Sequence, residues 1–164
     1  AHGNQPIQHM IYLYNSVGQP WKTQARAREV MGRLYQSTPD GMCGDEDTGQ
    51  MSAWYVFSAM GFYPVCPGTT EYQIGSPLFD CATLTLPGGK KFVVNTKSNG
   101  PQHPYIQRAN LNGAAFNKTF LDHRQITGGG ELIFEMGSAP DYKWATLPES
   151  RAPSALKNLS GKTR

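Results

Sequence analysis

Charge is scarce in this sequence of 164 residues: 15 lysines and arginines stand against 12 aspartates and glutamates, a formal net charge of +3. The basic residues are scattered, which excludes the dense positive surface of a nucleic-acid-binding protein. No apolar run is long enough to span a membrane as a helix. No signal peptide is present either, an absence that says nothing about localisation if the chain is the late part of a longer protein. A chain of this length can bury one ordinary core or two small ones.

Cysteine is also scarce. Cys43, Cys66 and Cys81 form no pair at a metal-binding spacing, and their odd number leaves at least one thiol free or paired elsewhere. We expect buried free thiols, and a bridge between Cys66 and Cys81 in an oxidising compartment is the alternative.

Helical patterns fill the first part of the chain. Apolar residues recur at helical spacing in residues 6–14 and again in residues 23–36, where Thr23 is the expected N-cap. Residues 48–60 form the third expected helix and are apolar on almost every side. Such a profile is typical of a helix buried inside a larger body.

Strand patterns follow from about residue 72. Asn112-Gly113 is a hairpin signal between two of these strands. The expected strands cover residues 82–86, 91–96, 105–111, 114–120 and 131–136. The sequence therefore predicts an α+β fold, with helices over residues 1–68, an antiparallel β segment over 69–144 and a polar tail over 145–164.

An acidic loop stands out against this background. Asp45, Glu46 and Asp47 lie next to one another in a stretch rich in glycine, directly before the third expected helix. Asp47 to Gln50 has the form of a capping box, with an acidic N-cap and a glutamine three residues later. Capping needs only one carboxylate, however, and three adjacent ones repel unless a cation, a substrate or a proton resolves them. From composition alone, helix capping and a catalytic or binding loop both remain open.

The helix order predicts what lies beside this loop. Successive helices joined by short loops alternate in direction, so the segment before the first helix falls on the same face as the loop after the second. Asn4 and Gln5 are therefore expected beside the acidic loop.

Several motifs resemble one enzyme family. They are GNQP (residues 3–6), YLYN (12–15), GQPWKTQ (18–24), PDGMCGDEDTGQMSAW (39–54), YVFSAMGFYPVCPG (55–68) and IGSPLF (74–79). Together they resemble the late part of glycoside hydrolase family 92, whose members are calcium-dependent exo-acting α-mannosidases that invert the anomeric carbon. The resemblance spans roughly residues 3 to 144, and family members are several times longer. It implies a C-terminal piece that holds the last helices of an (α/α)6 toroid and the trailing β segment.

The resemblance also implies site residues. By position, Asp47 is the general base and Asp45 is the second aspartate of the loop, although members often carry asparagine at the latter position. The general acid is a glutamate on an upstream part that nothing in this chain matches. The chain alone is thus expected to be incomplete and inactive.

Calcium in this family binds the mannose hydroxyls, and a hard cation of this kind takes oxygen ligands. Asn4, Gln5 and Glu46 are the oxygen-bearing side chains expected near the substrate and the calcium ion, and the alternative for Asn4 and Gln5 is simple capping of the helix at Pro6. The expected partners are mannose-containing glycans and the remaining N-terminal part of the same enzyme, in a secreted, periplasmic or cell-surface setting.

A non-catalytic carbohydrate-binding module is the rival hypothesis. Such a module needs exposed aromatic residues on its strands. The aromatic residues of the strand half mostly fall at positions expected to alternate inward, which favours a core: Tyr72, Phe79, Phe92, Tyr105, Phe116, Phe120 and Phe134.

Overall fold

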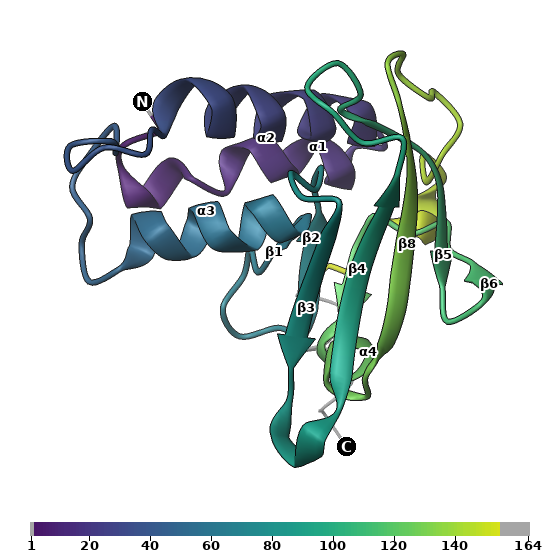
Figure 1. Cartoon of the computed structure of the whole chain (residues 1–164). Helices are drawn as coiled ribbons and strands as arrows, with labels where there is room; N and C mark the ends of the chain where they lie inside the picture. The colour runs from purple at the N-terminus through teal and green to yellow at the C-terminus, as the bar shows by residue number, and fades with distance from the viewer. Residues whose placement is uncertain (1, 155–164) are drawn as a thin grey trace, which may run out of the picture.

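The computed structural model describes residues 2–154. Helices occupy one side of the molecule and strands the other (Figure 1). The helical elements are η1 (Gln5–Ile7), η2 (Met10–Tyr12), α1 (Leu13–Ser16), α2 (Pro20–Leu34) and α3 (Gln50–Met60). No helix in the described part of the chain has the length and apolar character needed to cross a membrane.

The first helical segment is not the continuous helix that the spacing predicts. It consists of two short 3-10 turns followed by one turn of α-helix. The Gln8 carbonyl accepts a hydrogen bond from the indole of Trp54 at 3.3 Å, while the Tyr12 N–H donates to the His9 carbonyl at 2.9 Å. In an α-helix the Gln8 carbonyl would accept from the Tyr12 N–H. Because Trp54 bonds this carbonyl instead, the backbone adopts the tighter 3-10 pattern.

The second helix begins four residues earlier than expected, since its N-cap is Gln19 and not Thr23. Pro20 is its first residue, and Gln19 is the N-cap. Proline suits this position because its fixed φ is already helical and its missing N–H has no partner there in any case. Thr23 is therefore a buried residue of the first helical turns, and its expected role as N-cap is wrong.

The strands form two sheets. A small sheet has the order β1-β2-β7, and a larger one has the order β3-β4-β8-β5-β6. Their bounds are β1 (Phe62–Tyr63), β2 (Glu71–Ile74), β3 (Cys81–Thr85), β4 (Lys91–Lys97), β5 (Tyr105–Leu111), β6 (Ala114–Ala115), β7 (Phe120–Asp122) and β8 (Gly130–Gly137). A short helix, α4 (His123–Thr127), and two 3-10 turns, η3 (Pro87–Gly89) and η4 (Pro148–Ser150), complete the described elements.

The larger sheet is mixed, whereas the sequence predicted antiparallel pairing throughout. β8 pairs antiparallel with β5 but parallel with β4. β4 and β5 run in opposite directions, so any strand inserted between them must be parallel to one. The expected hairpin at Asn112-Gly113 is confirmed, with left-handed φ values of 52° and 85°. The expected strand over residues 114–120 is divided, because β6 ends at Ala115 and Phe120 belongs to β7 in the other sheet.

Polar side chains attach the helices to both sheets. The Asn15 side-chain amide donates to the Ile74 backbone carbonyl at 2.9 Å, and the Gln24 side-chain Oε1 accepts from the Ile106 N–H at 3.1 Å. Arg28 donates to the Ser76 hydroxyl at 3.0 Å and also to the Pro77 carbonyl. Buried polar groups are tolerated only when they are paired, so these contacts define how the helices sit on the strands.

The residues after β8 return to the sheet. Trp144 and Ala145 are buried, and the Ser150 carbonyl accepts a hydrogen bond from the Thr119 N–H at 2.8 Å. Ala145 and Ser150, expected in a polar tail, thus pack on the β half. The remainder of that predicted tail, residues 155–164, lies outside the described residues.

Candidate active site

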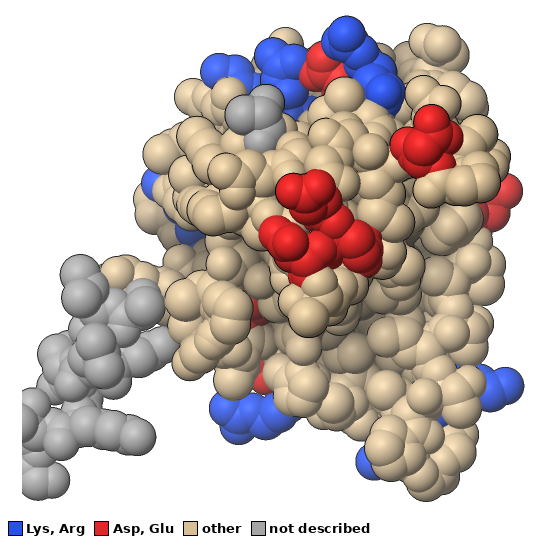
Figure 2. Space-filling view, turned by 90° about the vertical axis from the view of Figure 1, so that its left-hand side faces the viewer, with Lys and Arg blue, Asp and Glu red and all other residues tan. Residues whose placement is uncertain are grey.

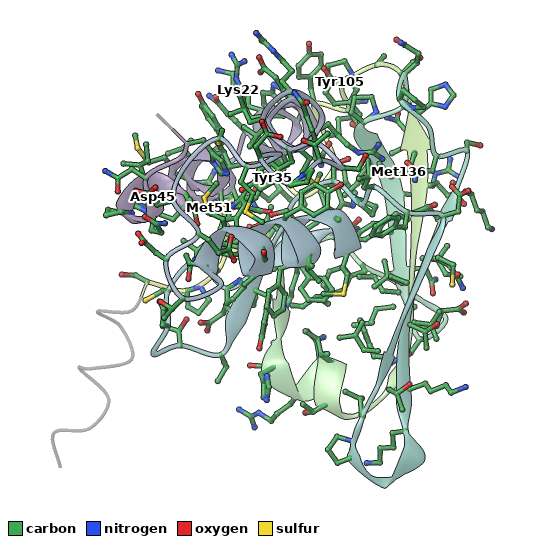
Figure 3. All side chains as sticks on the ribbon, turned by 60° about the vertical axis from the view of Figure 1, so that its left-hand side comes forward. Lys22, Tyr35, Asp45, Met51, Tyr105 and Met136 are labelled. Carbon is green, nitrogen blue, oxygen red and sulfur yellow. The ribbon has the colours of Figure 1, made fainter. Side chains whose placement is uncertain are left out.

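The loop between α2 and α3 lies at the end of the helices remote from the large sheet (Figure 1). It starts with a turn, closed by hydrogen bonds from Gly41 N–H to Thr38 O and from Gln36 N–H to Gly41 O, at 2.9 and 2.8 Å. The turn places the following acidic stretch at the surface. Asp and Glu side chains gather there in one compact patch (Figure 2), and Asp45 lies at this end of the molecule, far from Met136 in the sheet (Figure 3).

The N-terminal segment lies directly against the acidic loop, as the alternation of helix direction predicts. A Cβ added to Gly44 would stand 2.1 Å from the Gly3 carbonyl oxygen, and one added to Gly3 would stand 2.5 Å from the Cys43 carbonyl oxygen. The Gln5 amide donates a hydrogen bond to the Asp45 carbonyl at 2.7 Å. Two segments about 40 residues apart are thus held in backbone contact.

The start of α3 excludes the capping-box reading of Asp47. Gly49 is the N-cap, and no side chain caps it. Asp47, Thr48 and Gly49 have left-handed φ values of 37°, 57° and 86° in succession. The carboxylate that serves the helix start belongs to Glu46, whose Oε1 accepts from the Ser52 N–H at 3.3 Å. Asp47 is therefore free of a capping role.

An open pocket of about 810 Å³ adjoins the loop. Asp47, Asn4 and Gln5 all line it, so the structure brings together three of the five residues singled out from the sequence. Asp45 and Glu46 are not in its wall. Asp45 is exposed, and Glu46 is half-buried with its Oε2 lacking a hydrogen-bond partner in the described part of the chain. The other lining residues are Pro6, His9, Gln50, Ala53, Phe57, Tyr63, Pro64, Val65 and Pro67.

Three polar residues of this wall were not predicted as site residues. His9 is one of them. Its position one helical turn after Gln5 was a usable signal. Gln50 was predicted only as part of a capping box, and it reaches the pocket as the first residue of α3. Tyr63 carried no signal in the sequence, because its placement depends on how α3 ends at Gly61 and enters β1.

A buried aromatic group supports the loop from below. The His2 Nε2 lies 2.9 Å from the Tyr35 hydroxyl oxygen. The His2 ring packs edge-on against Trp54, with ring centroids 4.2 Å apart. Burial lowers the pKa of His2 to about 4 and raises the pKa of Tyr35. Both side chains are thus neutral near pH 7. Trp54 is fully buried between the helices, as expected.

The cysteines are free, but the expectation that they are buried is wrong. Cys43, Cys66 and Cys81 are all exposed. Cys43 lies within the acidic loop itself. Among residues 2–154, no three His, Cys, Asp or Glu side chains gather closely enough to hold a metal ion by themselves.

Most aromatic residues of the strand half point into the core. Phe92 and Phe134 are fully buried, and Phe116 is 7% exposed. Phe79 alone among the large apolar residues of this predicted set is strongly exposed, at 48%. The described strands therefore offer no row of aromatic side chains on which a sugar could stack, which disfavours the binding-module hypothesis.

Comparison with known proteins agrees with this picture. Residues 1–138 match the family model of the glycosyl hydrolase family 92 catalytic domain. The family GH92 inverting mannosidase BT2199 from Bacteroides thetaiotaomicron is 57% identical, with a TM-score of 0.89 over 94% of this chain and 21% of its own. The family GH92 alpha-mannosidase BT3965 from the same organism is 40% identical, with a TM-score of 0.91 over the same shares. An uncharacterized secreted glycosidase of Arthroderma benhamiae is 30% identical over 93% of this chain and 20% of its own length.

The α+β fold with its pocket beside an acidic loop thus matches one part of these family GH92 structures. The chain belongs to glycosyl hydrolase family 92. It spans about a fifth of the length of these relatives.

Proposed function

We propose that the chain is part of an inverting exo-α-mannosidase that hydrolyses terminal α-mannosides of glycans. The observation that carries this proposal is the position of Asp47. Its side chain does not cap α3, and Asp47 lines the pocket with Asn4 and Gln5. The similarity to BT2199, an inverting mannosidase, and to BT3965, an alpha-mannosidase, supports the same reaction.

Asp47 is the proposed general base. In an inverting glycosidase the base removes a proton from a water molecule that attacks the anomeric carbon from the face opposite the leaving group. The left-handed backbone at Asp47 and Thr48 keeps both residues outside α3, which begins at Gln50. Asp45, two residues before the base on the same loop, is proposed as the second aspartate of the site; in this part of the enzyme it is exposed and lies outside the pocket wall.

The general acid is proposed to lie outside this chain. Inverting enzymes place acid and base roughly 6.5 to 9.5 Å apart on opposite sides of the sugar. Glu46 lies on the same loop as Asp47 and contacts the start of α3 instead. We therefore propose that the upstream part of the same enzyme supplies the acid, as a glutamate, and that this chain alone does not turn over substrate.

The residues of the loop face fit a calcium ion in donor chemistry. Asn4 and Gln5 present amide oxygens in the pocket wall, and the Glu46 Oε2 is buried without a partner. Calcium takes six to eight oxygen ligands, so these side chains would supply only part of the shell. When bound, such an ion polarises and orients sugar hydroxyls. The Gln5 amide nitrogen donates to the Asp45 carbonyl, so the Gln5 side-chain oxygen remains available to other partners.

The setting is proposed to be secreted, periplasmic or at the cell surface, where mannose-bearing glycans are found. A relative described as a secreted glycosidase supports this placement.

The test is a substitution in the full-length enzyme. Replacing Asp47 by asparagine removes the base with little change in shape, and we expect kcat on an aryl α-mannoside to fall by roughly 10²- to 10⁴-fold. Proton NMR of the first product should show β-mannose for the wild type, as inversion requires.

Asp40→Asn is the matched control, because Asp40 lies on the same loop but outside the pocket wall. It should keep wild-type activity. An Asp47→Asn enzyme with undiminished kcat would contradict the assignment, and α-mannose as the first product would contradict inversion.

A further inference from the structure

Gln8, Gln50 and Tyr63 form a chain of hydrogen bonds that ends at the pocket. The Gln50 Nε2 lies 3.3 Å from the Gln8 Oε1 and 2.8 Å from the Tyr63 hydroxyl oxygen. Gln50 and Tyr63 both line the pocket with Asp47, whereas Gln8 is buried behind them. The chain thus runs from the interior to the cavity wall.

The bonds of this chain have a defined direction. The Gln8 Nε2 donates to the Met51 sulfur at 2.7 Å, so its Oε1 is the end that faces Gln50. The Gln50 amide nitrogen is a donor only, and it therefore donates to both neighbours. The Tyr63 oxygen must accept. Its own proton has no acceptor among the hydrogen bonds of the described part of the chain.

The phenol ring is also held in place. Tyr63 is only 8% exposed, and its ring stacks on Tyr12 with centroids 5.5 Å apart. Its backbone belongs to β1, in register with Gln73 of β2. A donor fixed in this way loses little rotational freedom when it binds a partner. Burial raises the pKa of Tyr63, which keeps the hydroxyl protonated and a donor at neutral and moderately alkaline pH.

We propose that the Tyr63 hydroxyl donates a hydrogen bond to one oxygen of the sugar bound beside Asp47, and that Gln50 and Gln8 set the direction of that bond. Tyr63 is then a specificity-determining residue for a polyhydroxylated ring. This inference rests on the proposed function of the pocket. A site built to bond one hydroxyl discriminates strongly against the analogue that lacks it, because a buried polar group is then left unpaired.

Tyr12 offers a matched control within the same aromatic stack. Its hydroxyl bonds to the Ser58 hydroxyl at 2.8 Å, in the interior, and Tyr12 does not line the pocket. Tyr12→Phe and Tyr63→Phe therefore remove the same atom from two stacked rings, but only one of them faces the cavity.

The experiment uses the full-length enzyme with an aryl α-mannoside and its 2-, 3-, 4- and 6-deoxy analogues. We expect Tyr63→Phe to lower kcat/KM on the parent mannoside by roughly 5- to 100-fold. On one deoxy analogue, Tyr63→Phe should have almost the same kcat/KM as the wild type, because that analogue already lacks the sugar oxygen that the Tyr63 hydroxyl would bond. Tyr12→Phe should change kcat/KM by the same small factor on every substrate.

Losses from Tyr63→Phe that are equal on all five substrates, or no greater than those of Tyr12→Phe, would overturn the inference while leaving the proposed function intact. A wild-type enzyme that does not hydrolyse the parent mannoside would overturn the proposed function itself. If Tyr63→Phe lowers the melting temperature well below that of Tyr12→Phe, Gln50→Met makes the same comparison, because it keeps the phenol and removes the donor that orients it. It should weaken the discrimination at the same sugar position, and unchanged discrimination would overturn the inference.

Discussion

Asp47, Thr48 and Gly49 adopt left-handed backbone one after another, and only the last is a glycine. Each non-glycine residue in this region costs about 1–2 kcal/mol. The turn is held by hydrogen bonds from the Gln50 N–H to the carbonyls of Glu46 and Asp47, at 3.1 and 3.2 Å. Strain of this kind persists where surrounding contacts impose it, and it gathers at functional sites. Here it separates the Asp47 side chain from the helix that follows.

His2 makes the support of this loop sensitive to pH. Burial lowers its pKa from 6.5 to about 4, so the folded protein keeps the ring neutral while the unfolded chain binds a proton below pH 6.5. Between pH 6.5 and 4 the unfolded state holds more protons, and the free energy of unfolding therefore falls as the pH falls. We expect the melting temperature of the full-length enzyme to drop through this window, and the drop to be smaller in His2→Asn.

His103→Asn is the control for that measurement, since His103 lies on the strand side and, within residues 2–154, its ring bonds only to the Ser98 carbonyl. It should follow the wild-type pH profile. Equal slopes for the wild type and His2→Asn would show that His2 does not contribute.

At the scale of elements, the site depends on the contact between the N-terminal segment and the acidic loop. Gly44 has no room for a side chain, because a Cβ there would lie 2.1 Å from the Gly3 carbonyl oxygen. Gly44→Ala should push the two segments apart and separate Asn4 and Gln5 from Asp47. A displacement of about 1 Å can cost on the order of 100-fold in rate, and we expect a loss of that size in kcat/KM on an aryl α-mannoside.

Gly68→Ala is the matched control, because a Cβ at Gly68 would have no neighbour within 4 Å. It should leave kcat/KM unchanged. If Gly44→Ala is as active as Gly68→Ala, the segment contact does not position the site.

The elements also show how far sequence reasoning reaches. Four of the five predicted strands, the hairpin turn and the long helices are present, because each depends on local periodicity and turn chemistry. The position of β8 between β4 and β5 is set by contacts distant in sequence, which no local pattern records. The same holds for the site. The family motif predicted Asp47, and the alternation of helix direction predicted Asn4 and Gln5 beside its loop, whereas Tyr63 reaches the pocket through the packing of β1 on α3.

At the scale of the whole molecule, the two cores of the described residues meet at Phe57. One core lies among the helices around Trp54 and the other among the strands around Phe134, and Phe57 packs against both. Yet Val56 on α3 and Met10 and Leu13 at the first helical turns remain 54%, 53% and 45% exposed. The pocket opens on the same helical part.

The calcium proposal belongs to this scale, because the described residues include no group of three His, Cys, Asp or Glu side chains that could hold the ion alone. Treating the full-length enzyme with a calcium chelator should lower hydrolysis of an aryl α-mannoside at least tenfold. Added Ca²⁺ should restore it. Mg²⁺ should restore it poorly, because it demands a smaller, stricter octahedral shell. Activity unchanged after chelation and dialysis would contradict a calcium requirement.

The central place of β8 has a consequence for how the protein is made. This strand is the last among the described residues 2–154, yet it joins the β3-β4 hairpin to the β5-β6 hairpin. During synthesis both hairpins exist first as separate units, each with an open edge ready to pair with another chain. Until residues 130–137 emerge, the large sheet cannot close. Its completion is therefore a late, long-range step of folding, when the growing enzyme is most exposed to aggregation.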